Sequence, residues 1–460
     1  MRVSEPLKFY SEVVNEDFMQ SLLSAEGVRH RNCIFSAAVV IWLTIFQRLR
    51  PHRSLAHAVD SLRDGASDLL LQRASGSVRV RRGNISGSTA GLSQARSRLP
   101  LAVVENVVDT LFTSMTCPEA EQDVKDVYIF DGTTLSIAHS AKNIAEYPQF
   151  RNQHGPAHYP LVQVVAAVNV MTGLALRPAM GPYCGKNAGG EIALAEQILP
   201  RLPKGAIAIG DRYYGMFRFA YAAKNNNVPV LCRFKEINAK RFIGSPGDTS
   251  GEKHVVWTPS KHELKKYPEL SAESSVEGRF VWAPLIRRGF RPQCFVLFTT
   301  LDWTVDKLLG LYAQRWNVEL DLRDIKQTLE MDFIHGQSPD IVKKEILLGF
   351  AAYNLIKHCI STAAAAAKLP PRSLSFSMVL NRIDLLGTLL LTADKSKNTH
   401  DSIERALCDL KPLLVYRRPT KRQPEPRKVW PRGARNFFVS SSSRHQEREL
   451  LIKQSQRLRA

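Results

Sequence analysis

The chain has 460 residues, 44% of them hydrophobic and 23% charged, which is typical of a soluble globular protein with two to four structural units. Its 63 Lys and Arg outnumber 43 Asp and Glu, so the formal net charge is +20. The seven cysteines are dispersed without CxxC or Cys/His spacing, which argues against a disulfide scaffold and a zinc site. No apolar signal-peptide segment is evident, and the longest apolar run, Cys33 to Phe46, is too short to span a bilayer. We therefore expect a cytoplasmic protein with no membrane association.

The positive charge is concentrated in two stretches. Residues 48–98 carry ten Arg against three Asp, and residues 411–460 carry fourteen Lys or Arg against three Glu. The rest of the chain is nearly neutral. Basic flanks around a neutral middle indicate contacts with a polyanion outside a central core. A basic surface kept for solubility explains the composition equally well.

Residues 1–120 are predicted to be helical. Apolar periodicity indicates helices at Cys33–Leu49, Leu55–Leu62, Leu69–Gln72 and Leu101–Met115. Hydroxyl side chains before residue 90 can cap a further short helix, Ala90–Leu99, which presents Arg96 and Arg98. The spacing resembles a helix-turn-helix, so we expect a DNA-binding domain here with Arg96 and Arg98 as contacts. A basic loop on a helical domain is at least as consistent with the sequence.

Strands replace helices from about residue 121. The run VYIF ends in Asp131, and the run AIAIG ends in Asp211. Residues 161–170 and 174–180 are joined by Met-Thr-Gly, which suits a β-hairpin. Further elements are a helix at Glu191–Leu199, a helix from Met216 and a strand at 228–234.

Residues 235–300 contain short β runs separated by turn-like segments, so we interpret them as an inserted, mostly β subdomain. A long helix follows from about Thr304 to Met331, and an apolar, Ala-rich helix covers 345–368. From Lys411 onward Pro and Arg dominate, which predicts an extended or partly disordered basic tail.

This order of elements predicts an α/β fold with a ribonuclease-H-like catalytic core, in which a mixed sheet has flanking helices and is interrupted by a mostly β insertion. The N-terminal and C-terminal regions are helical. The predicted units are an N-terminal DNA-binding domain (1–120), the catalytic core (121–234 and 301–345), the inserted β subdomain (235–300), a C-terminal helical region (346–410) and the basic tail (411–460).

The predicted helix 304–331 carries a polar stripe. Its members are Tyr312, Arg315, Glu319 and Lys326. At about 100° per residue these side chains fall within roughly 60° of one another, whereas Asp321 and Asp324 point elsewhere. Helix geometry therefore selects Glu319 as the acid of this face. For an arbitrary helix, a solvated ladder of ion pairs is the simpler explanation of such a stripe.

Three motifs resemble one known family. The spacing Y-x-x-R-x-x-x-E-x-x-x-x-x-x-K, from Tyr312 to Lys326, is similar to the signature of bacterial DDE transposases of the insertion-sequence-four family. That family carries an Asp in a D-G-T context, which residues 131–133 match, and a second Asp in a D-R-x-[YF] context, which residues 211–214 match. The motifs occur in the expected order, and the resemblance covers residues 121–335.

The resemblance implies that Asp131, Asp211 and Glu319 are the catalytic residues and the metal ligands. In-line attack on a phosphodiester needs an activated water or 3′-hydroxyl and a stabilised leaving oxygen, and two Mg²⁺ ions held by carboxylates supply both. Asp131 would bridge the two ions, Asp211 and Glu319 would each complete one site, and Mn²⁺ would substitute for Mg²⁺. A single Asp at a strand end is more simply explained as a turn or cap residue. Three acids in the expected order favour the metal-binding explanation instead.

Four further residues near the acids are expected to meet DNA. Arg315 and Lys326 project along the Glu319 face, where they could grip phosphates. Tyr312 could bind a phosphate or stack on a base. Arg212, beside the second acid, is either a DNA contact or a structural ion-pair partner.

The resemblance also implies a flipped DNA base near this helix, which needs a stacking surface. Within the insertion, the candidates for this surface are Phe295, Trp257 and Trp282, and Phe295 is preferred for its distance in sequence before Tyr312. An aromatic side chain is, however, more often part of a core. His154 and His158 lie four residues apart, but Gly and Pro lie between them, so we do not expect them to bind a metal.

The predicted function is a cut-and-paste DNA transposase. It would bind the terminal inverted repeats of its element, cleave the DNA and transfer the 3′ ends to target DNA. Synapsis of two ends implies at least a dimer on DNA, with the protein nucleoid-associated when bound. Two alternatives remain: a catalytically silent DNA-binding relative, and a ribonuclease-H-like nuclease without strand transfer. The large N-terminal domain and the insertion favour transposition, because a plain nuclease needs neither.

Overall fold

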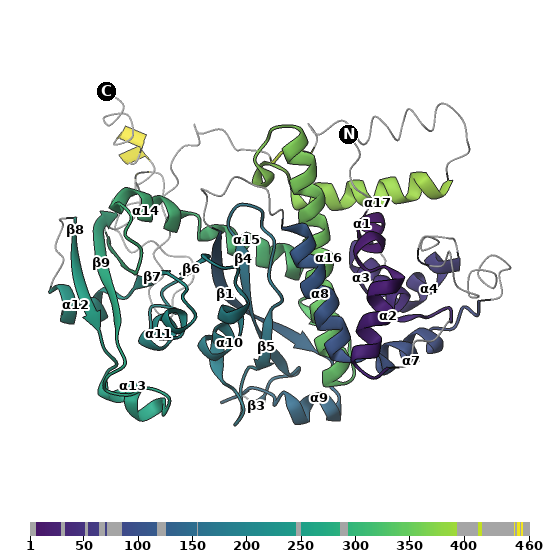
Figure 1. Ribbon diagram of the computed structural model, residues 1–460, viewed down its shortest axis with the longest axis horizontal. Coiled ribbons are helices and arrows are strands. Elements are labelled where there is room, and N and C mark those ends of the chain that lie inside the picture. The colour runs from purple at the N-terminus through teal and green to yellow at the C-terminus, as the bar shows by residue number, and fades with distance from the viewer. Residues whose placement is uncertain are drawn as a thin grey trace.

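Figure 1 shows a computed structural model of the chain. It describes residues 6–28, 33–50, 54–63, 85–116, 126–153, 155–244, 250–285, 293–392 and 413–415, together with positions 70, 446, 449, 450, 452 and 453. Nearly all of the predicted helix at Leu69–Gln72, most of the basic tail, and His154 lie outside these residues.

A nine-stranded mixed sheet forms the centre of the described part of the chain. Its strand order is β5-β4-β1-β6-β7-β10-β9-β8, and β11 pairs with β1. The strands are β1 (Val127–Ile137), β4 (Leu161–Asn169), β5 (Ala179–Pro182), β6 (Ile207–Gly210), β7 (Val230–Phe234), β8 (Gly251–Trp257), β9 (Val276–Leu285), β10 (Gln293–Thr299) and β11 (Phe333–Ile334). A separate short ribbon pairs β2 (Arg151–Asn152) with β3 (Gly155–Pro156).

The directions of the strands confirm the predicted fold class. β1 runs antiparallel to β4, which pairs antiparallel with β5, so the predicted hairpin forms one edge. On its other side β1 runs parallel to β6, and β6 runs parallel to β7. The central strands are apolar runs buried on both faces, as a sheet covered by helices requires. The protein is therefore a mixed α/β fold with flanking helices in the ribonuclease-H-like strand order.

The flanking and terminal helices follow the apolar periodicity of the sequence. They are α1 (Pro6–Val13), α2 (Glu16–Ala25), α3 (Ala37–Leu49), α4 (Leu55–Arg63), α7 (Ala90–Arg98), α8 (Leu101–Met115), α9 (Ala141–Glu146), α10 (Gly190–Ile198), η1 (Leu199–Arg201), α11 (Phe217–Asn225), α12 (Glu236–Ile243), α13 (Lys261–Lys266), α14 (Val305–Ala313), α15 (Trp316–Arg323), η2 (Asp324–Thr328), α16 (Pro339–Ala366), η3 (Pro371–Ser373) and α17 (Phe376–Thr392). α16 is long and apolar enough to span a membrane, but 83% of its apolar window is buried inside the protein. It is a core helix.

The N-terminal helices and the β insertion lie at opposite ends of the molecule. α1 to α4 and α7 gather on the far side of α16 and α8, while β8 and β9 form the other extremity (Figure 1). α16 packs against α3 and α8, so it joins the N-terminal helices to the core. Within residues 235–300, β10 pairs antiparallel with β7, so the strands of the predicted insertion extend the core sheet. The division of the chain into domains stays a prediction.

The prediction of one continuous helix from Thr304 to Met331 is wrong. α14 ends at Ala313 and α15 begins at Trp316, because the backbone tightens between them into i→i+3 hydrogen bonds such as Arg315 N to Tyr312 O (3.0 Å). After Arg323 the helix widens into the π-helical segment η2, in which Leu329 N donates to Asp324 O at 2.9 Å. A uniform 100° rotation per residue therefore does not hold from Tyr312 to Lys326.

Candidate active site

Asp131 and Asp211 lie side by side where two parallel strands separate. The register of β1 and β6 places Phe130 opposite Gly210, and each acid is the next residue along the chain. Asp211 follows the end of β6, whereas Asp131 lies within β1, which continues to Ile137, so the strand end predicted at Asp131 is wrong. Gly132 N donates to Asp131 Oδ1 at 2.9 Å, and Tyr213 N donates to Asp211 Oδ1 at 2.7 Å. Each carboxylate is thus oriented by a backbone amide of the chain that follows it.

Gly210 is required by the turn after β6. A Cβ atom at this position would lie 2.3 Å from the Tyr214 Cβ, so a side chain cannot be accommodated without moving the turn. The turn closes with Tyr214 N donating to Asp211 O at 3.2 Å. Because the turn is tight, the Tyr214 ring lies close to Gly210 and to the two acids.

The site is crowded with negative charge. The pKa of Asp131 is raised to about 7, mainly by burial and also by the carboxylates of Asp211 and Glu191, while the Gly132 amide and Arg315 oppose the shift. Burial likewise raises the pKa of Glu191. Neighbouring carboxylates raise one another's pKa in this way, and a bound cation would relieve their repulsion.

Glu191 was missed by the sequence analysis. It lies in the first turn of α10, and its Oε1 accepts a hydrogen bond from the Tyr214 hydroxyl at 3.0 Å. An acid in the first turn of a helix is explained equally well by the helix dipole, so its local sequence does not mark it. Only the packing of α10 against β4 and β5 brings it beside Asp131 and Asp211.

Glu319 lies on α15, which packs against β1. Its Oε1 forms an ion pair with Arg315 Nη2 at 2.8 Å. The Arg315 guanidinium also lowers the pKa of Asp131, so this cation interacts with both the first and the third predicted acid. Among the described residues, no three His, Cys, Asp or Glu side chains are grouped closely enough to hold a metal ion.

Asp321 has a structural role. It is 1% exposed, with Oδ1 paired to Lys357 Nζ at 2.9 Å and Oδ2 paired to Arg372 Nη2 at 2.9 Å. Burial alone would raise the pKa of Asp321, but the two cations hold it below its ordinary value. The prediction that Asp321 points away from the Glu319 face agrees with this arrangement.

Tyr312 is buried rather than presented to solvent. It is 6% exposed, and its ring meets the Phe295 ring edge-on with the centroids 5.2 Å apart. The Arg233 guanidinium covers Phe295 at 4.5 Å from the ring centroid. Phe295 therefore already has an aromatic and a cationic neighbour. Of the other two stacking candidates, Trp257 is a core residue at 2% exposure and Trp282 is half-buried.

Several polar and aromatic side chains close in sequence to the acids are exposed or half-buried. Arg212 is exposed beside Asp211, and Lys326 is half-buried within η2. Tyr213 and Trp316 are the large aromatic side chains nearest in sequence to the predicted acids that are strongly exposed, at 50% and 59%.

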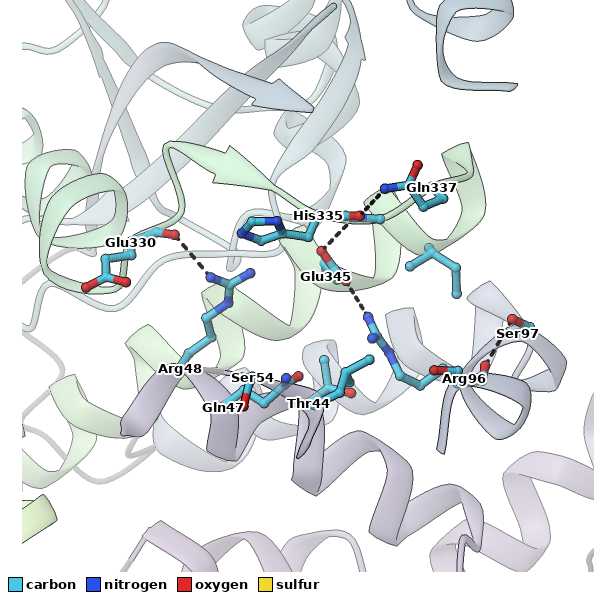
Figure 2. Close-up of a pocket in the computed structure, with 14 residues that line it drawn as sticks. Thr44, Gln47, Arg48, Ser54, Arg96, Ser97, Glu330, His335, Gln337 and Glu345 are labelled. Carbon is cyan, nitrogen blue, oxygen red and sulfur yellow. Dashed lines mark hydrogen bonds and ion pairs between the residues drawn. The ribbon is translucent and has the colours of Figure 1, made fainter. Parts of the chain in front are cut away.

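Arg96 does not suit the DNA contact predicted for it. It is 8% exposed, and its Nη2 pairs with Glu345 Oε1 at 2.5 Å (Figure 2). Glu345 Oε2 also accepts from Gly336 N at 3.2 Å, so this ion pair ties α7 to α16 and to the loop before it. Arg98, at the end of α7, is exposed.

The same ion pair lines a polar pocket of about 540 Å³ between the N-terminal helices and the core (Figure 2). Arg48 donates to the Glu330 carbonyl at 3.1 Å across this pocket, and His335 and Gln337 line its other side. None of the three predicted acids lines it, so it is separate from the candidate active site.

The fold, the paired acids and the ordered motifs together point to the family of DDE transposases. Residues 122–355 match the family model described as "Transposase DDE domain", and the chain belongs to this family. This confirms the resemblance stated above.

One curated relative is "Transposase InsG for insertion sequence element IS4" from Escherichia coli (strain K12). The chain is 27% identical to it over 261 residues, which are 54% of this chain and 55% of that protein. The match thus spans about half the length of the curated relative. A solved structure, "Cryo-EM structure of piggyBac transposase synaptic complex with hairpin DNA (SNHP)", is similar with a TM-score of 0.43 and 10% identity, covering 89% of this chain and 86% of that one.

Proposed function

We propose that this protein is a cut-and-paste DNA transposase that binds element ends, cleaves the DNA backbone and transfers the 3′ ends to target DNA. The observation that supports this most is the placement of Asp131, within β1, beside Asp211, which directly follows the parallel strand β6. Glu319, on the helix that packs against β1, supplies the third acid of the motif. Membership of the DDE transposase family supports the same reaction class.

Asp131, Asp211 and Glu319 would hold two Mg²⁺ ions, or Mn²⁺ in their place. The fit rests on the neighbouring carboxylates of Asp131 and Asp211: burial, and to a smaller extent the charges of Asp211 and Glu191, raise the pKa of Asp131 to about 7. Hard divalent cations prefer carboxylate oxygens and relieve this repulsion. When bound, the ions would activate the attacking hydroxyl or water and stabilise the leaving oxygen.

Arg315 is the residue through which DNA binding would affect the third acid. Its guanidinium holds Glu319 at 2.8 Å and is partly exposed, so a DNA phosphate could compete for it. Lys326 and the exposed Arg212 would bind neighbouring phosphates. The buried Tyr312 would act by packing beneath Arg315 and by fixing Phe295.

The N-terminal helices would bind the terminal inverted repeats, with the exposed Arg98 as a contact. The buried Arg96 would instead hold these helices against the core through Glu345. Because two element ends must be brought together, the active form would be at least a dimer on DNA. The target DNA would occupy the face that carries the three acids.

The test is a strand-transfer assay with a duplex ending in the inverted repeat that flanks the coding sequence, pre-cleaved at the element end, plus target DNA and Mg²⁺. Wild-type protein should yield joined product, and Glu319→Gln should abolish it without weakening binding to the duplex. Asp332→Asn, an exposed acid beyond η2, is the matched control and should join normally. Hydrolysis without joining would favour a nuclease, and binding without either reaction would favour a silent relative.

A further inference from the structure

We infer that Glu191 is a positioning residue that fixes Asp131 and Asp211 relative to each other. This inference rests on the proposed function, because it concerns the carboxylates that would hold the metal ions. Glu191 belongs to none of the three motifs. It lies on a third element, α10, which packs on the hairpin strands β4 and β5.

The first contact joins Glu191 to the loop that carries Asp211. Tyr214, three residues after Asp211, is 1% exposed and donates its hydroxyl to Glu191 Oε1 at 3.0 Å. A buried hydroxyl without a partner is costly, so this bond fixes both side chains. The Tyr214 ring also packs against Phe130, the residue before Asp131, with the centroids 6.2 Å apart.

The second contact joins Glu191 to the strand that carries Asp131. A Cβ atom built on Gly132 would lie 2.2 Å from Glu191 Oε1, 2.3 Å from its Cδ and 2.9 Å from its Cγ. The carboxyl group thus occupies the volume that any other residue at position 132 would need. This close approach gives a physical reason for glycine directly after Asp131.

Through these two contacts, Glu191 can fix the position of Asp131 relative to Asp211, which neither acid can do alone. The pairing of β1 with β6 stops at Phe130 and Gly210, so Asp131, which continues β1, and Asp211, which follows β6, are the first residues beyond it. Glu191 contacts Gly132 after the first acid and Tyr214 after the second, at the point where the two segments separate. It is held on a helix rather than on a loop. Outer partners that orient metal ligands typically change metal affinity by about 10- to 100-fold when removed.

The experiment measures Mn²⁺ affinity of the full chain by electron paramagnetic resonance, with the thermal unfolding midpoint recorded for each variant. Glu191→Gln keeps an oxygen that accepts from Tyr214, whereas Glu191→Ala removes it. We expect Glu191→Ala to bind Mn²⁺ at least about tenfold more weakly than Glu191→Gln. Tyr214→Phe should weaken binding in the wild-type background but not in Glu191→Ala. Glu196→Ala is the control on the same helix, because Glu196 pairs with Arg218 at 2.6 Å and should leave Mn²⁺ binding unchanged.

Equal losses in Glu191→Gln and Glu191→Ala would overturn the inference, because charge alone would then matter. Additive losses from Tyr214→Phe and Glu191→Ala would also overturn it. If Glu191→Ala unfolds, the comparison of Tyr214→Phe alone with wild type decides: unchanged Mn²⁺ affinity refutes a role through this bond. Failure of the wild-type protein to bind Mn²⁺ at all would instead refute the proposed function.

Discussion

Two acids that lie two residues apart on α15 should fail in different ways when replaced. Asp321→Ala removes a carboxylate that is 1% exposed and leaves Lys357 and Arg372 without their partner. Removing one member of a buried ion pair typically costs about 3–5 kcal/mol. The Lys357 side chain is only 9% exposed and the Arg372 side chain 24%, so the stranded Lys357 charge should account for most of the loss.

Urea unfolding followed by circular dichroism measures this cost. Asp321→Ala should lower the free energy of unfolding by about 3–5 kcal/mol, a large fraction of the stability of a typical protein. Glu319→Gln should change it by less than about 1 kcal/mol, because the Glu319 side chain is 37% exposed and its ion pair is solvated. Per folded molecule, Asp321→Ala should retain strand transfer, whereas Glu319→Gln should lose it. A fully stable Asp321→Ala protein that has lost strand transfer as completely as Glu319→Gln would refute the assignment of Glu319.

Three further outcomes follow from the packing. Gly132→Ala should destabilise the protein by about 1–3 kcal/mol in urea unfolding, because the added methyl group would collide with the Glu191 side chain. In the Glu191→Ala background the same substitution should cost much less. Equal costs in the two backgrounds would contradict this explanation. Burial lowers the pKa of His358, so its neutral form is favoured in the folded state, and stability should fall as the pH drops below about 6.5, where the unfolded chain gains a proton. In His358→Phe this part of the pH dependence should disappear, and an unchanged slope would argue against it. Arg96→Met or Glu345→Leu alone should each cost about 3–5 kcal/mol, and the double variant should recover most of it in the same measurement. A double variant as unstable as the sum of the two single variants would contradict this.

Asp211 could be predicted at the end of its strand, because an apolar run ending in Asp indicates a buried strand, and Asp211 directly follows β6. The same expectation is wrong for Asp131, because β1 continues through Gly132 to Ile137, where pairing with β4 keeps the backbone extended. The family motifs then give those acids a chemical meaning. The mixed sheet follows from the same order of strands and helices.

Glu191 and Arg96 could not be placed in the same way, because their roles depend on contacts between elements distant in sequence. Arg96 meets Glu345 across 249 positions, and the basic composition of its segment gives no indication of burial. The break after Ala313 was missed because Gln314 and Arg315 are good helix formers, and only the hydrogen-bond pattern distinguishes a tightened turn from a regular one.

The pairing of β10 with β7 has a consequence for how the protein avoids association with its own copies. If residues 235–300 were deleted, β7 (Val230–Phe234) would become an apolar strand with a free row of backbone donors and acceptors. Such edges pair readily with other chains. In the intact protein the outer strand is β8, where the exposed Glu252, Lys253 and His254 follow one another. Charged side chains at an edge oppose strand addition, so this segment keeps the catalytic sheet from growing into an aggregate.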